Sequence, residues 1–374
     1  MMDIRLYTQM LEIDSTSGRE RGLADFLAER LLTQKNSLMR FDVEFMRADT
    51  PEGCGVPQNL FFSWGAPKVI FCSHLDTVPP YIAPHIDGSM ATGRGTCDAK
   101  GQIFAMWEAC KAMEDMGMTN FGLLLLAGEE TGSFGAKAFN SVISGEAGIS
   151  PDAWVIVGEP TDNCMATAEK GTKSYDITFT GKSCHSGYPE LGASAIMYFN
   201  DFVSALRSIV FPVDEVLGET AWNIGDLVSA NPQNILSDRL TCRIYFRTTF
   251  ESDEMVRNIM KNIAGPDARL RFGRPAVQDG SDIVAKSVAP WQEAMSVNLR
   301  GGDAPTRFEV LDGFPVKPVA FGSDAPVLKC FRHKILCGPG SIHVAHRPDE
   351  HINIEDIETA VRNYIKMAQR ILEQ

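Results

Sequence analysis

The stretch Val69-Ile-Phe-Cys-Ser-His74-Leu-Asp76 decides the fold class of this chain of 374 residues. A short, continuous apolar run that leads directly into polar side chains is typical of a parallel strand buried on both faces. The arrangement recurs at residues 121–126 before Glu129-Glu130, at 153–157 before Glu159, and at 334–337 before His346. Open α/β sheets place their sites just beyond the carboxyl ends of such strands. The repetition therefore predicts an α/β fold with a metal centre at one edge of its sheet.

Each motif taken alone also has an ordinary interpretation. Residues two apart in an extended chain point the same way, so Asp76 could hold one ring nitrogen of His74 while the other nitrogen binds a metal. Both could equally be solvated loop residues. Asp98 lies in a glycine-rich segment and could either bridge two ions or serve only as a turn residue. Glu129 and Glu130 suit a general base beside a metal ligand, or else a surface pair that caps the next helix.

Taken together, the motifs supply two imidazoles and three carboxylates: His74, Asp98, Glu130, Glu159 and His346. If Asp98 is shared, each of two ions receives one histidine, one bridging carboxylate oxygen and one further carboxylate. Such a set leaves a position open for water on each ion, as in catalytic zinc sites. By chemistry alone, His343 would serve as well as His346.

The composition limits the classes of partner. The formal net charge of -13 disfavours nucleic acid and anionic membranes as partners. No apolar run approaches the length that crosses a bilayer, and the first residues show no secretory signal. The nine cysteines are scattered without C-x-x-C spacing, which is typical of reduced thiols. We therefore expect a cytoplasmic protein.

The pattern along the chain indicates two domains. Ser17-Gly-Arg-Glu20 has the spacing of a capping box, and residues 101–116 and 354–372 have helical periodicity. Residues 169–281 differ, because their strands alternate between apolar and polar side chains. Their β-α-β-β-α-β order predicts a ferredoxin-like unit, inserted into a domain formed by residues 1–168 and 282–374. Its expected strands lie near 175–179, 222–228, 240–248 and 270–272, and its expected helices at 193–209 and 251–263.

The ordered motifs resemble those of the acetylornithine deacetylase and succinyl-diaminopimelate desuccinylase family of co-catalytic zinc hydrolases, which also contains carboxypeptidases and aminoacylases. The resemblance spans essentially the whole chain and rests on residues 73–76, 95–101, 128–130, 158–160 and 345–350. It implies a zinc-exopeptidase-like catalytic domain with a mostly parallel central sheet. It also implies that the inserted ferredoxin-like α+β unit is a lid and dimerisation domain.

The resemblance further implies a role for each motif residue. Two divalent metal ions, zinc or alternatively cobalt, would be held by His74, Asp98, Glu130, Glu159 and His346. The family position selects His346 over His343, makes Asp98 the bridging ligand and makes Glu129 the general base. Asp76 would be catalytic through His74. The peptide bond between Asp98 and Ala99 would be cis.

Three residues of the insert also match the family. His185, in Gly181-Lys-Ser-Cys-His185-Ser-Gly, would stabilise the developing oxyanion, reaching the active site of a neighbouring subunit of a homodimer. Asn234 and Arg247 would bind the carboxylate of the substrate, which suits the fork geometry of arginine. At Asn234 the chain departs from the family pattern, since Ile-Leu-Ser follows in place of Val-Ile-Pro.

The substrate class follows from finer features. Gly322-Ser-Asp324 resembles the deacetylase branch, so we expect an amidohydrolase that converts N-acetylornithine to ornithine and acetate in arginine biosynthesis. A carboxypeptidase or dipeptidase is the main alternative, followed by deacylases of acetylcitrulline, succinylornithine, acetyl-lysine or succinyl-diaminopimelate. A catalytically silent binding or assembly module is disfavoured, because every expected ligand and the Glu129 base are present.

Overall fold

The computed structural model describes residues 2–46, 50–143, 148–270, 272 and 288–373 and divides the chain into two units. Unit 1 comprises residues 1–167, 307–319 and 323–374. Unit 2 comprises residues 168–306 and 320–322. Unit 2 is therefore inserted into the chain of unit 1.

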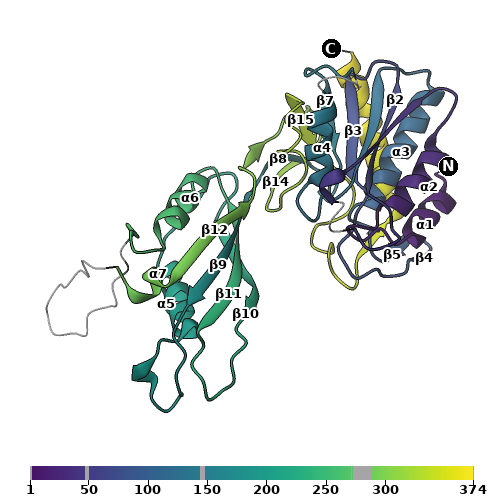
Figure 1. Ribbon diagram of the computed structural model, residues 1–374. Helices are drawn as coiled ribbons and strands as arrows, with labels where there is room; N and C mark the ends of the chain where they lie inside the picture. The colour runs from purple at the N-terminus through teal and green to yellow at the C-terminus, as the bar shows by residue number, and fades with distance from the viewer. Residues whose placement is uncertain (1, 47–49, 144–147, 271, 273–287, 374) are drawn as a thin grey trace. The chain divides into compact units, whose positions relative to one another are not determined.

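The central sheet of unit 1 has six strands: β1 (Ser37–Asp42), β2 (Gln58–Trp64), β3 (Val69–His74), β6 (Phe121–Leu126), β7 (Trp154–Val157) and β15 (His333–Leu336). Their order is β1-β2-β6-β3-β7-β15. Figure 1 labels β2, β3, β7 and β15, which follow one another in that order. The four strands from β6 to β15 run parallel, whereas β2 is antiparallel to both β6 and β1. Every position of β3 and β6 is buried, which explains why their sequences are continuously apolar.

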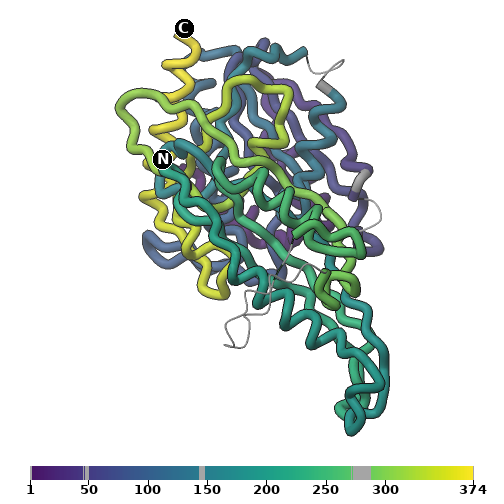
Figure 2. Tube along the Cα trace, turned by 90° about the vertical axis from the view of Figure 1, so that its left-hand side faces the viewer, coloured from purple at the N-terminus to yellow at the C-terminus, as the bar shows by residue number. Residues whose placement is uncertain are grey.

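Helices cover both faces of this sheet. On one face, α3 (Lys100–Asp115) and α8 (Ile354–Leu372) pack against β3 and against each other, although they are far apart in the sequence (Figures 1 and 2). α1 (Ile4–Glu12) contacts α3, and α2 (Arg21–Leu31) contacts β2. On the other face, Phe139 of α4 (Phe134–Ile143) contacts Phe61 of β2, whose neighbour Phe62 belongs to the core beneath α3 and α8. Successive strand residues point to opposite faces, so the unit has three layers.

Short strands complete unit 1. β4 (His85–Asp87), β5 (Met90–Thr92) and β16 (His351–Asn353) form an antiparallel sheet in the order β16-β5-β4. A short 3₁₀ helix, η1, spans Glu44–Met46. β8 (Met165–Glu169), β13 (Thr306–Arg307) and β14 (Val316–Val319) form a further sheet and include the residues at which the chain passes between the units.

Unit 2 is an antiparallel sheet with helices. Its strands β9 (Gly171–Thr180), β10 (Ala221–Val228), β11 (Arg239–Thr248) and β12 (Met295–Gly301) lie in the order β10-β11-β9-β12. Buried and half-buried residues alternate along β9 and β11, as expected where one face of a sheet covers a core. That core is shared with α5 (Ala195–Arg207), α6 (Asp253–Asn262) and α7 (Pro290–Glu293), and η2 spans Pro189–Leu191.

The predicted α/β class and the ferredoxin-like β-α-β-β-α-β order are confirmed, but the last strand of the insert was misplaced. Leu270 and Phe272 are not in a strand, and Arg271 lies outside the described residues. The fourth strand is β12, which pairs with β9 from Met295 opposite Phe179 onward. Unit 2 extends to Thr306, and the predicted boundary between residues 281 and 282 lies outside the described residues.

None of the helices in the described ranges combines the length and apolar composition that crossing a bilayer requires.

Candidate metal centre

The site begins at the carboxyl ends of three neighbouring parallel strands. His74 is the last residue of β3 and pairs in register with Leu126, the last residue of β6. On the other side of β3, Cys72 pairs with Val157, the last residue of β7. The segments that carry Glu129-Glu130 and Glu159 therefore emerge on either side of His74. This register is what brings side chains far apart in sequence to one edge.

Asp98 lies between two imidazoles. Its Oδ1 is 3.1 Å from Nε2 of His74, and its Oδ2 is 3.2 Å from Nε2 of His346. The peptide bond between Asp98 and Ala99 is cis, as the resemblance implied, and α3 begins at the next residue. One carboxylate thus presents one oxygen to each histidine, which is the geometry of a bridging ligand.

The five predicted ligands form two groups that share Asp98. In each group the potential ligand atoms lie within 4.8 Å of one another: His74 with Asp98 and Glu159, and Asp98 with Glu130 and His346. A third such group joins His74 and Glu130 to Glu129. Each of the first two offers one imidazole nitrogen and two carboxylate oxygens, a donor set that suits zinc and related divalent ions.

Asp76 contacts the second ring nitrogen of His74, as the sequence-based interpretation expects, but mainly through its backbone. The nearest partner of Nδ1 of His74 is the backbone carbonyl of Asp76 at 3.0 Å, and the Asp76 carboxylate is 3.5 Å away. That carboxylate accepts the backbone N–H groups of Glu129 and Glu130 at 3.0 and 3.1 Å. It also accepts the hydroxyl of Ser17 at 2.9 Å. Asp76 therefore orients His74 through its carbonyl and holds the glutamate pair through its carboxylate.

The predicted capping box at Ser17–Glu20 is wrong. α2 begins at Arg21 with Glu20 as its N-cap, and no side chain caps it. Ser17 instead donates to Asp76, and Glu20 is completely buried. Burial, together with the nearby charge of Asp76, raises the pKa of Glu20 to about 8. The spacing in the sequence singled out both residues but assigned them to the start of the helix. In the structure, Ser17 supports the Asp76 carboxylate, and Glu20 is buried near it.

The acidic side chains crowd one another. Burial raises the pKa of Glu129 well above its usual range, and the charges of Glu159 and Glu130 add to this effect. Burial also raises the pKa of Glu159 and of Glu130. Asp324, a further buried acid, lies close enough for its charge to raise the pKa of both Glu129 and Glu159. Such a cluster favours the binding of cations, which would compensate the buried negative charge.

At Asp98 the two histidines lower the pKa, in contrast to the raised pKa values of the glutamates. Burial on its own would raise the pKa of Asp98, but hydrogen bonds from His346 and His74 outweigh it and hold the pKa below its usual range. Conversely, the hydrogen bonds of His346 to Asp98 and Glu130 raise the pKa of that imidazole to about 10. Asp98 is accordingly the ionised member of the cluster, as a bridging ligand must be.

The three predicted lid residues belong to unit 2. A β-bridge joins His185 to Ile235, so the loops that carry His185 and Asn234 lie side by side. Both side chains are exposed. Arg247 is in β11, where its guanidinium stacks 4.8 Å above the centre of the Tyr245 ring. The catalytic and substrate-binding roles of these residues stay predictions.

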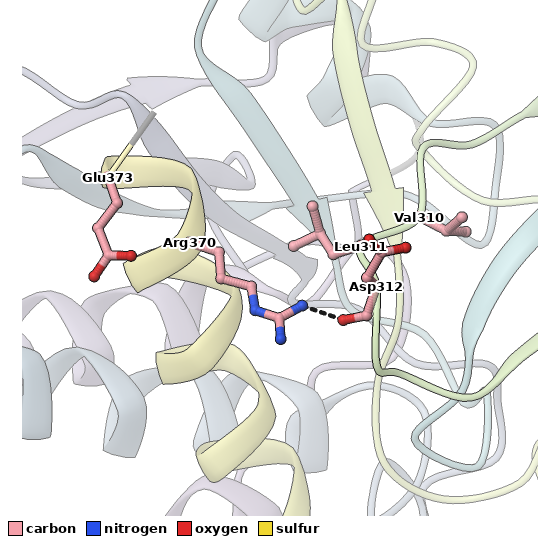
Figure 3. Close-up of a pocket in the computed structure, with 5 residues that line it drawn as sticks. All are labelled: Val310, Leu311, Asp312, Arg370 and Glu373. Atoms are coloured by element: carbon pink, nitrogen blue, oxygen red, sulfur yellow. Dashed lines mark hydrogen bonds between the residues drawn. The ribbon is translucent and has the colours of Figure 1, made fainter.

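Unit 1 also has a surface hollow that shares no residue with this cluster. It is lined by Val310, Leu311, Asp312, Arg370 and Glu373, of which Arg370 donates a hydrogen bond to the carbonyl of Asp312 (Figure 3). None of the predicted site residues lines it, so the hollow adds nothing to the metal centre.

Known proteins resemble this chain over most of its length. The family model described as Peptidase family M20/M25/M40 matches residues 70–370. A probable carboxypeptidase of Aspergillus terreus is 32% identical over an alignment that covers 98% of this chain and 86% of the relative.

Two solved structures show that the fold is shared. A tripeptidase from Staphylococcus aureus has a TM-score of 0.76 at 18% identity, with 99% of this chain and 98% of that chain covered. An M20 family metallo-carboxypeptidase from Sulfolobus solfataricus has a TM-score of 0.72 at 15% identity, with 99% of each chain covered.

The role of Asp76 leads to a first prediction. In Asp76→Asn, the amide can accept one of the two N–H groups of the glutamate pair, but its NH₂ group then faces the other donor. We expect binding of a divalent ion such as Zn²⁺ to weaken ~10- to 100-fold, as is common when a group that orients metal ligands is lost. Competition with a chromophoric chelator measures this change. Ser17→Ala, which removes only one hydrogen bond to the same carboxylate, should change the affinity far less. Equal affinity in Asp76→Asn and wild type would contradict the assignment.

The buried acid Glu20 leads to a second prediction, on pH. Its pKa of about 8 in the folded protein exceeds the ordinary value of 4.5, so the folded state holds a proton that the unfolded state has lost between these values. The contribution of Glu20 to stability therefore falls as pH rises from 4.5 to 8, by up to ~1.4 kcal/mol per pH unit. Glu20→Gln removes this dependence. Its Tm relative to wild type should rise between pH 5 and pH 8.5, and a constant difference would show that Glu20 does not titrate in this way.

Proposed function

The chain belongs to Peptidase family M20/M25/M40, and we propose that it is a carboxypeptidase that hydrolyses short peptides with two divalent metal ions. The observation that supports this most directly is the pair of donor groups that share Asp98. The 32% identical relative is named a probable carboxypeptidase, and a structural neighbour is a metallo-carboxypeptidase. The acetylornithine deacetylase branch expected from the sequence finds no support in these relatives. The carboxypeptidase, named above as the alternative, is better supported.

The two reactions share their chemistry. Each hydrolyses an amide whose nitrogen belongs to an amino acid with a free α-carboxylate, and they differ in whether a peptide or a small acyl group lies on the other side. The same metal centre can therefore serve both. The discrimination depends on the pocket that receives the acyl side, where small differences in shape or charge decide.

The donor set fits the proposed ions. His74, Asp98 and Glu159 would hold one, and Asp98, Glu130 and His346 the other, with nitrogen and oxygen donors that suit zinc and also cobalt. When bound there, such ions polarise the scissile carbonyl and make water a better nucleophile at neutral pH.

Glu129 would be the general base. It lies in the same cluster as His74 and Glu130, and Asp76 holds its backbone N–H. Its carboxylate would take a proton from the attacking water and deliver it to the departing amine. Burial raises the pKa of Glu129 above its usual range, which favours a group that must accept a proton and then release it.

Unit 2 would complete the site. We assign to Arg247 and Asn234 the binding of the substrate α-carboxylate, and to His185 the stabilisation of the oxyanion, within a homodimer in which this histidine comes from the neighbouring subunit. The exposure of His185 and its place beside the loop of Asn234 are consistent with such a contact.

The assignment of the base leads to a third prediction. Glu129→Gln preserves the shape of the side chain but cannot accept the proton, so kcat should fall ~10²- to 10⁴-fold with metal content equal to that of wild type. His346→Ala should instead lower the metal content, measured by elemental analysis of dialysed protein. Normal kcat in Glu129→Gln would exclude it as the base.

The substrate class leads to a fourth prediction. A carboxypeptidase should cleave dipeptides and N-blocked peptides with a free C-terminal carboxylate, and it should not cleave the same peptides when they end in a carboxamide. We expect kcat/KM for these peptides to exceed that for N-acetylornithine, measured by chromatography of the released amino acid. Glu129→Gln is the matched control for contaminating peptidases. A preference for N-acetylornithine would overturn the proposal in favour of the deacetylase.

A further inference from the structure

Glu350 binds the loop that carries Asp98. Its carboxylate is buried, and its Oε1 accepts the backbone N–H groups of Gly95, Cys97 and Asp98 at 3.0, 3.0 and 3.1 Å. Three donors that converge on one oxygen hold the direction of the chain at the point where Asp98 projects towards the two histidines. Hydrogen bonds to a charged acceptor are about twice as strong as neutral ones, so this contact restrains the loop firmly.

Arg94 extends the same contact to the segment after His346. Its Nη1 lies 2.6 Å from Oε2 of Glu350 and donates to the carbonyl of Arg347 at 3.2 Å. The N–H of Gly93 donates to the carbonyl of Glu350 at 3.0 Å. Beyond these contacts, β5 and β16 continue the pairing as antiparallel strands. Hydrogen bonds thus join residues 90–98 to residues 347–353 at several points.

His346 depends on this connection more than His74 and Glu159 do. His74 ends a buried strand, and Glu159 follows another closely. By contrast, the side chain of His346 is half exposed, and the residue has a φ of 62°, a left-handed conformation that is unfavourable for a residue other than glycine. Such a conformation persists where neighbouring contacts enforce it. The contacts of Glu350 and Arg94, which begin one residue after His346, provide that restraint.

We propose that Glu350 is a positioning residue that sets the distance between Asp98 and His346 and thereby controls the affinity of one of the two metal positions. This inference rests on the proposed two-metal function. The position formed by Asp98, Glu130 and His346 depends on Glu350. The position formed by His74, Asp98 and Glu159 depends on it less, because two of its three ligands are fixed by the central sheet.

The test measures the amount of bound zinc rather than the catalytic activity. Metal-loaded protein is dialysed against a graded series of buffered Zn²⁺ concentrations, and the bound zinc is determined by elemental analysis. Wild type should show two ions. In Glu350→Gln the weaker-bound ion should need ~10- to 100-fold more free Zn²⁺, while the other is retained within a few-fold. Added Zn²⁺ should then restore the kcat of this variant, which would not occur if the substitution had only damaged the fold.

The pair Lys173 and Asp253 provides a matched control. It is also a buried ion pair with a 2.6 Å contact, and Asp253 also accepts a further hydrogen bond, from Thr248, but it lies in unit 2. Asp253→Asn should lower Tm and leave both zinc affinities as in wild type. If Glu350→Gln does not fold, the double variant Arg94→Gln, Glu350→Gln takes its place, because it leaves no buried charge without a partner.

The outcomes separate the two proposals. Two ions in wild type, with both affinities unchanged in a folded Glu350 variant, would overturn the role of Glu350 alone. Equal weakening of both ions would also overturn it, since the effect would then not be selective for the His346 position. A wild-type protein that holds no second ion at any Zn²⁺ concentration would overturn the two-metal function and this inference with it.

Discussion

The Asp98 carboxylate between two imidazoles is the interaction on which the rest of the site depends. Buried carboxylates repel one another, and an ionised acid in a low-dielectric site is stable only with partners of opposite charge. At this edge of the sheet, Asp98 has such partners in His74 and His346, each within 3.2 Å. Glu130 also contacts His346 at 2.9 Å, and burial raises the pKa of Glu129 and of Glu159. The cluster is thus constructed to accept cations, and its geometry offers them two positions.

Two of the loops that carry ligands are held by the same kind of contact, a carboxylate that accepts backbone N–H groups. Asp76 accepts the N–H groups of Glu129 and Glu130, and Glu350 accepts those of Gly95, Cys97 and Asp98. In both cases a buried carboxylate binds the backbone next to a ligand rather than the ligand itself. A backbone held by two or three charge-assisted hydrogen bonds leaves little freedom to the side chain that it carries. The Asp76 carboxylate adds negative charge to a region that is already acidic, whereas Arg94 compensates the charge of Glu350.

The central sheet explains why these loops can meet. In parallel strands the carboxyl ends lie at one edge, and the register of β3 between β6 and β7 brings the segments after Leu126 and Val157 to either side of His74. Every position of the two central strands β3 and β6 is buried beneath the helices. The inserted unit 2 has its own core and its own sheet, and its fold is specified independently of that edge.

The amino-acid sequence by itself determined the α/β class and marked His74, Asp98, Glu130 and Glu159 as candidate ligands, because both depend on local patterns. Local pattern left the choice between His343 and His346 open, and the family resemblance selected His346. Continuous apolar runs mark strands buried on two faces, and polar residues directly after them mark the carboxyl edge. The tertiary structure alone decided how the supporting residues act. Ser17 and Glu20 have the spacing of a capping box, but Ser17 donates to Asp76, and Glu20 is a buried acid whose pKa is raised by burial and by the charge of Asp76. β12 replaces the expected strand at 270–272 because it pairs with β9. The partners of Asp76 and of Glu350 lie more than fifty residues away, at Glu129 and at Asp98. Periodicity reports which face of an element is buried, but a hydrogen bond between distant loops depends on how the whole sheet brings them together.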